Sequence, residues 1–82
     1  MKSEILFNAI NKRQKIKFVY EFLPMEIEPY YLSINKNGNK VVYGRTNASN
    51  RIQAFEFNKI FNIKVLSKSK FSPIIPILSI YK

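Results

Sequence analysis

The chain has 82 residues, of which 46% are hydrophobic, and a formal charge of +9. This length suits one domain of modest stability, and the apolar content argues against a disordered chain. Because the sequence contains no Cys, His or Asp, it excludes a disulfide scaffold and leaves only five Glu for metal or acid–base chemistry. We therefore expect a non-enzymatic protein without a metal or a cofactor.

The apolar runs are too short for a membrane span. The best candidate, from Ile74 to Tyr81, is interrupted by Pro76 and Ser79, whereas a bilayer needs roughly 20 apolar residues. No charged segment followed by an apolar one opens the chain, so export is not indicated. We expect a cytoplasmic protein with no membrane partner.

The first predicted element is a helix that begins after Ser3. Ser3 is a favoured N-cap residue, and Glu4 suits the positive end of the helix dipole. One apolar stripe runs along the helix at helical spacing, made of Ile5, Leu6, Ala9 and Ile10. This stripe predicts a helix that covers the core.

A two-residue period replaces the helical one at Lys15 and predicts two strands. In the first strand the residues expected to face inward are Ile16, Phe18, Tyr20 and Phe22. The second strand runs from Met25 to Ile34, and its apolar positions change parity near Pro29, which predicts a bulge or bend there. Its two acids, Glu26 and Glu28, share one face, which we expect to be solvated rather than catalytic.

Three further strands follow, joined by turns. Residues 35–39 contain an Asn-Gly step typical of a hairpin loop, and strands are predicted over 40–46 and 51–57 with a turn at 47–50. After a corner at 58–60, Phe61, Ile63 and Val65 alternate with polar or apolar neighbours as a fifth strand, and 68–70 form a polar link. The order predicts a mainly β, antiparallel barrel or strongly curved sheet over residues 1–70, followed by an extended apolar tail over 71–82.

These elements resemble the WYL domain of bacterial regulators. The residues that carry the resemblance are Ala9-Ile10, Tyr20, the stretch from Pro29 to Leu32, Val42-Tyr43-Gly44, the corner from Phe55 to Ile60, then Ile63, Val65, Leu66 and Phe71. The resemblance implies a five-stranded Sm-like, SH3-type barrel with one N-terminal helix, in a module that senses a ligand or binds nucleic acid.

The sequence departs from this family at polar positions of its binding groove. Gln53 and Met25 stand where an Arg is usual, and Asn58-Lys59 replaces an Asp-Arg pair. Only Tyr20, Tyr43 and Lys59 match candidate site residues of the family. The two tyrosines are equally consistent with a place in the hydrophobic core.

Two functions remain open at this stage. The first is binding of nucleic acid or of an anionic, nucleotide-like ligand, with Tyr20 and Tyr43 as ring contacts and phosphate contacts from Lys15, Lys17, Arg45, Arg51, Lys59 and Lys64. The same Lys and Arg also suit a merely solvated surface. The alternative is a homodimer or a protein complex, in which the tail from Phe71 to Lys82 adds a strand to a partner, unless that tail folds back on its own barrel.

Overall fold

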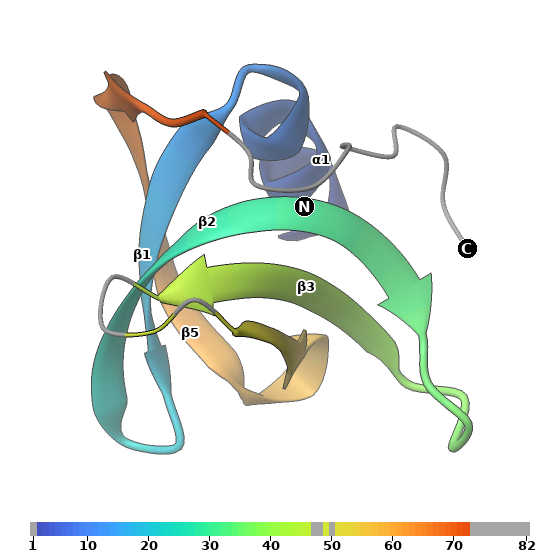
Figure 1. Ribbon diagram of the computed structural model, residues 1–82. Coiled ribbons are helices and arrows are strands. Elements are labelled where there is room, and N and C mark those ends of the chain that lie inside the picture. The colour runs from blue at the N-terminus through green and yellow to red at the C-terminus, as the bar shows by residue number, and fades with distance from the viewer. Residues whose placement is uncertain (1, 47–48, 50, 73–82) are drawn as a thin grey trace.

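The computed structural model describes residues 2–46, 49 and 51–72 as one helix, α1, five strands and a short 3₁₀ helix, η1 (Figure 1). Their bounds are α1 Lys2–Asn11, β1 Gln14–Tyr20, β2 Leu23–Ile34, β3 Lys40–Thr46, β4 Ile52–Glu56, η1 Phe57–Lys59 and β5 Ile60–Lys70. The predicted fold class is confirmed, because the strands form one antiparallel sheet with the N-terminal helix packed against it.

The sheet curls around its core in the strand order β4-β3-β2-β1-β5 (Figure 1). β2 is the long central strand, and it bends across the molecule between its two neighbours. The predicted irregularity near Pro29 is confirmed, since the β2–β3 register shifts between Pro29 and Tyr31. The shift lets Ile27 and Leu32, at positions of opposite parity, both face the core.

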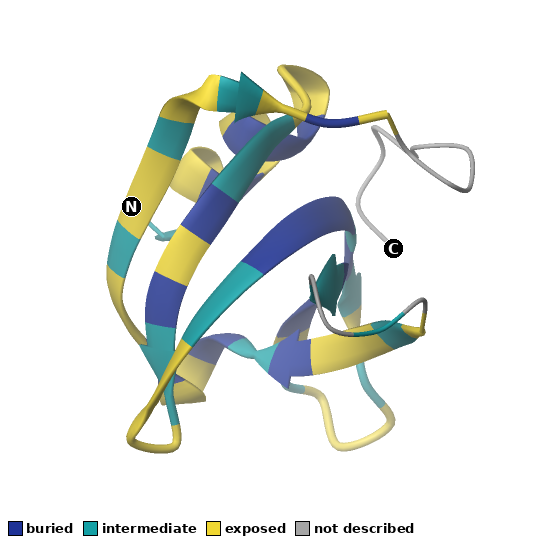
Figure 2. Ribbon diagram, turned by 60° about the vertical axis from the view of Figure 1, so that its left-hand side comes forward, coloured by how far each residue is buried: buried dark blue, intermediate teal, exposed yellow. Residues whose placement is uncertain are grey.

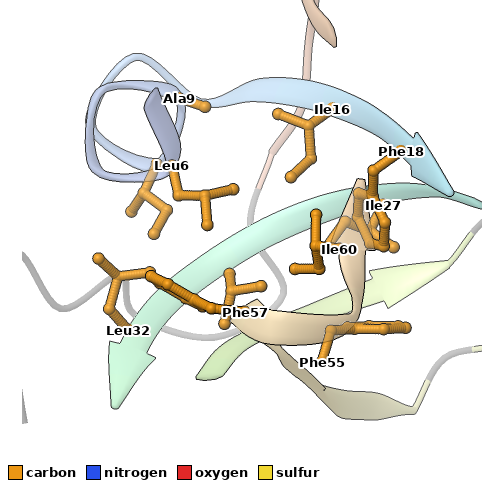
Figure 3. Close-up of a cluster of buried hydrophobic side chains, with 11 residues drawn as sticks. Leu6, Ala9, Ile16, Phe18, Ile27, Leu32, Phe55, Phe57 and Ile60 are labelled. Atoms are coloured by element: carbon orange, nitrogen blue, oxygen red, sulfur yellow. The ribbon is translucent and has the colours of Figure 1, made fainter. Parts of the chain in front are cut away.

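The core lies between α1 and the concave side of the sheet. Figure 3 shows side chains of α1, of the strands and of η1 gathered in one cluster, with Leu6 and Ala9 at one end and Phe55 at the other. The buried cluster consists of Leu6, Ala9, Ile10, Ile16, Phe18, Ile27, Leu32, Val42, Phe55, Phe57 and Ile60. Three aromatic rings stabilise one end of this cluster by edge-to-face contacts. The centroid of the Phe55 ring lies 5.5 Å from that of Phe18 and 5.1 Å from that of Tyr20.

Helix α1 differs slightly from its prediction. It begins at Lys2, so Ser3 lies in its first turn and is not the N-cap. Leu6, Ala9 and Ile10 are buried as expected, whereas Ile5 is exposed at the border of the stripe. The packed face is therefore narrower than the sequence suggests.

Phe22 does not face inward, contrary to its predicted place in the first strand. β1 ends at Tyr20, which pairs with Leu23, and the two residues between them have positive φ angles, 49° at Glu21 and 68° at Phe22. Two positive φ angles in a two-residue hairpin loop are typical of a type I′ turn. The turn points the Phe22 side chain into solvent, where it is 98% exposed.

Strand β5 also departs from simple alternation. Its register with β1 shifts between Lys17 and Val19, and Asn62 on β5 has a φ of 57°. This bulge rotates the strand, so Ile63 packs against the core while Phe61 and Val65 are exposed. β5 continues through 68–70, which are therefore strand residues and not a link.

Phe71 is anchored to the domain although the sequence assigned it to the tail. Its N–H donates a 3.0 Å hydrogen bond to the carbonyl of Arg13, and its ring lies 5.6 Å from that of Tyr30, both rings being buried. The rest of the predicted tail, from residue 73 onward, lies outside the described residues. Among the helices that the structure describes, none is long and apolar enough to cross a membrane.

Candidate polyanion-binding face

The side of the sheet that faces away from the core carries most of the candidate binding residues. We call it the outer face and define it by Lys15, Lys17 and Val19 of β1, Glu26 and Glu28 of β2, Tyr43 and Arg45 of β3, and Phe61 and Lys64 of β5. In Figure 2 buried residues alternate with less buried ones along much of the sheet. Side chains of directly paired residues lie on the same face, so the register tells which of these groups are neighbours.

Lys17 and Lys64 face each other directly across β1 and β5. Both are exposed, and Lys17 pairs on its other side with Glu26 of β2. The row therefore holds two positive charges and one negative charge. Like charges at directly opposite positions destabilise a sheet, and the single carboxylate of Glu26 leaves the row with a net positive charge that an external anion would compensate.

Arg45 is held by Glu28, its partner in the β2–β3 register. Its Nε and one terminal nitrogen donate hydrogen bonds of 3.1 and 3.0 Å to Oε1, and the same terminal nitrogen lies 2.9 Å from Oε2. The buried Tyr30 hydroxyl donates a further 2.8 Å hydrogen bond to Oε1. Glu28 is thus a counter-ion already in place for Arg45.

The environment of Glu28 keeps it ionised although it is only 6% exposed. Burial of the carboxyl acts to raise its pKa, but hydrogen bonds from Arg45 and Tyr30, with the charges of Arg45 and Lys15, outweigh burial and lower the pKa of Glu28. The expectation of a solvated acid at this position was wrong. Glu26 and Glu28 point to different surroundings, one beside Lys17 and the other beneath Arg45.

Lys15 lies two residues before Lys17 on β1, beside Glu28 on the side away from Arg45. It precedes Ile16, which pairs with Ile27, and its charge is among those that lower the pKa of Glu28. Lys15, Lys17 and Lys64 are therefore brought together on the outer face. Arg51 is exposed and lies directly before Ile52, the β4 partner of Arg45, so it extends the positive surface toward β4.

The two candidate tyrosines have different environments. Tyr43 is half-buried and stacks on Tyr31, its partner across β2 and β3, with ring centroids 4.7 Å apart and an angle of 19° between the planes. Tyr20 packs against the core, and its hydroxyl accepts a 3.1 Å hydrogen bond from the backbone N–H of Glu56. Of the two, Tyr43 is the ring on the outer face.

Lys59 lies apart from the other lysines, near the β1–β2 turn. Its Nζ is 3.4 Å from a carboxylate oxygen of Glu21 and 3.6 Å from one of Glu56. The charge and hydrogen bond of Glu21, followed by the charge of Glu56, raise the pKa of Lys59. This lysine is partly neutralised within the chain.

A shallow hollow of about 370 Å³ adjoins the lysine row, with Lys17, Glu26 and Asn62 among the residues around it. Over the part of the chain that the structure describes, no three acids gather to form a metal site. The outer face offers cations, aromatic rings and one hollow, which suit an anionic ligand by ion pairing and stacking.

The fold defines a small module built from one strongly curved antiparallel sheet and an N-terminal helix. The chain is similar to the solved structure of proteasome accessory factor B/C (PafBC) of Arthrobacter aurescens, with a TM-score of 0.74 and 21% identity, over 88% of this chain and 12% of that one. At this identity the likeness concerns the fold, and it supports the WYL-like fold that the sequence predicts. The sequence matches no family model and no curated protein.

Proposed function

We propose that this chain is a non-enzymatic regulatory module that binds nucleic acid on its outer face, through phosphate contacts centred on Lys17 and Lys64. The observation that carries the proposal is the direct pairing of these two lysines across β1 and β5. A phosphate group between two ammonium groups would turn an unfavourable pair into a favourable one.

The charge of the whole chain supports a polyanionic partner. A formal charge of +9 on 82 residues attracts polyanions at long range and speeds their encounter. Lys15 lies next to the lysine row, and Lys68 and Lys70 continue along the same strand as Lys64. A phosphate chain that runs along β1 and β5 would meet Lys17, Lys64 and Lys15 first, and then the lysines near the register shift between Gln14 and Lys15.

The ion pair between Arg45 and Glu28 determines how much Arg45 contributes to anion binding. Because Glu28 already neutralises Arg45, that residue contributes less to the attraction of an anion than its exposed neighbours on β1 and β5. Tyr43, stacked on Tyr31, offers a ring at the β3 end of the face. We therefore expect the lysines to supply most of the affinity and the rings to supply contacts with bases.

The test is a titration of a fluorescently labelled single-stranded oligonucleotide, followed by anisotropy at 50 and 200 mM salt. We expect the affinity to fall steeply with salt, and both Lys17→Ser and Lys64→Ser to weaken binding and to reduce the salt slope by roughly one unit each. Lys36→Ser, in the loop between β2 and β3, removes the same charge elsewhere and serves as the matched control. Absence of binding at low salt, or an equal loss in the control variant, would reject the proposal.

A further inference from the structure

The most exposed large apolar side chains that the structure describes lie in the hairpin between β1 and β2 and on the adjoining start of β5. Phe22 is 98% exposed, Leu23 63% and Phe61 59%. Phe61 pairs with Val19 across β5 and β1, and Val19 pairs with Pro24 on β2, so these side chains share one end of the outer face. Leu23 pairs with Tyr20 and so lies on the core side of the sheet. We call the surface formed by Val19, Phe22, Pro24 and Phe61 the hairpin patch. The β1–β2 turn lies at the end of β1 away from α1 (Figure 1), whereas Phe61 lies near the start of that helix, with Nζ of Lys2 5.8 Å from the centroid of its ring.

The backbone holds Phe22 in this position at a cost. A positive φ is unfavourable for a bulky residue, and both loop residues of this turn adopt one where Asn or Gly is the usual choice. Exposure of a complete phenyl ring to water is also unfavourable. Two unfavourable features at one residue are explained if the ring is buried in a complex.

The charges around the hairpin patch indicate which kind of partner can bind there. At the rim Lys59 lies beside Glu21 and Glu56, and Lys2 lies over the Phe61 ring, so these charges balance in a chain whose formal charge is +9. The patch offers no excess of cations for a phosphate chain. It is instead the surface through which two positively charged copies can approach with the least repulsion.

From this arrangement we infer that the hairpin patch is a self-association surface, on which a second copy of the chain docks about a two-fold axis. Such an axis places Glu21 of each copy against Lys59 of the other, because an isologous interface pairs the same two groups twice. A hollow of about 240 Å³ bounded by Phe22, Phe61 and Lys59 receives the Phe22 ring of the second copy. A cavity of about 150 Å³ is already sufficient for benzene.

The area of the hairpin patch sets the strength of this association. The half-exposed Phe61 and the fully exposed Phe22 ring contribute about 300 Å² per copy, less than half of what a standard stable interface buries. The dimer is therefore weak and depends on concentration, with a dissociation constant of about 10 µM to 1 mM. Dimers of this kind form when copies are concentrated on a common ligand.

The first experiment is sedimentation equilibrium of the chain over roughly this concentration range. We expect the average mass to rise from that of a monomer toward twice that value. Phe22→Asn keeps a residue that tolerates positive φ, so the variant retains the turn while the dissociation constant rises by at least about tenfold. Phe7→Gln, which removes an exposed phenyl ring on α1, is the control and leaves association unchanged.

A charge exchange tests the two-fold arrangement. Glu21→Lys and Lys59→Glu each place like charges together across the axis, so each variant alone associates more weakly than the original chain. An equimolar mixture of the two variants restores association, because each copy then meets opposite charges. A wild-type chain that stays monomeric throughout, or a mixture that fails to recover, overturns the inference. So does a Phe22→Asn variant that loses oligonucleotide affinity at unchanged mass, since Phe22 would then contact bases.

Discussion

Arg45 donates to both carboxylate oxygens of Glu28, at distances of 2.9, 3.0 and 3.1 Å, and so fixes the β2–β3 pairing at the point where the two strands change register. The carboxylate is buried and also accepts the Tyr30 hydroxyl, which makes the pair part of the structure of the outer face. A buried charge of this kind is stabilising only while its partners remain.

Replacing Glu28 with Gln should destabilise the fold and strengthen polyanion binding. The amide accepts fewer and weaker hydrogen bonds from the guanidinium, so we expect a loss of about 2 kcal/mol in the free energy of unfolding, measured by urea denaturation. The released Arg45 should then increase oligonucleotide affinity.

Glu26→Gln is the matched control for this change, because it removes the same charge from the same strand at a less buried position. It should cost clearly less stability than Glu28→Gln. Equal losses in the two variants would mean that the buried pair with Arg45 is not special.

The same carboxyl predicts how stability depends on pH. The folded state lowers the pKa of Glu28, so the stabilising contribution is complete above the ordinary Glu pKa of about 4.3 and is lost as the pH falls through that value toward the folded one. Urea denaturation at pH 7 and near pH 3 should show the difference between the original chain and Glu28→Gln shrinking in acid. A difference that is constant with pH would contradict the assignment.

Lys64→Ser should stabilise the fold while it weakens binding. Removal of one member of the Lys17–Lys64 pair relieves a direct repulsion, with an expected gain of about 0.3 kcal/mol at low salt. Because salt screens exposed charges, the gain should disappear near 1 M salt. Thermal unfolding in parallel with Lys36→Ser measures this, and a variant less stable than the original chain would show that the pair is not repulsive.

Gly44 should not tolerate a methyl group. A Cβ at this position would lie 2.6 Å from Cδ1 of Ile27 and 2.7 Å from the backbone oxygen of Glu28, and the latter cannot move aside easily. We expect Gly44→Ala to cost about 2 kcal/mol. Gly38→Ala offers a comparison, because it meets open space but adopts a φ of 83°, and it should cost about 1 kcal/mol.

The sequence predicted the elements better than it predicted which side chains they expose. The helix, the five strands and the irregularity at Pro29 follow from local periods, which the chain obeys over most of its length. Phe22 was misplaced because alternation was continued into a two-residue turn. The exposure of Phe61 and Val65 was not predicted, because nothing in the local pattern marks the bulge at Asn62. Turns and bulges depend on backbone geometry that a period-two pattern does not contain.

The Arg45–Glu28 pair could have been found from the same parity change. Counted from the loop at residues 35–39, a regular ladder would place Pro29 opposite Arg45, and one extra residue in β2 moves Glu28 into that position. The cross-strand meeting of Lys17 and Lys64 had no such signal, because β1 and β5 are distant in sequence and their register is set by tertiary packing.

The irregularity in β2 also makes that strand unusually sensitive to length. Its two halves present opposite parities to the core, with Ile27 in the first half and Leu32 in the second. Deletion of a single residue between them would turn every later side chain of the strand to the wrong side of the sheet. Evolution can therefore exchange residues along this strand far more readily than it can insert or remove them.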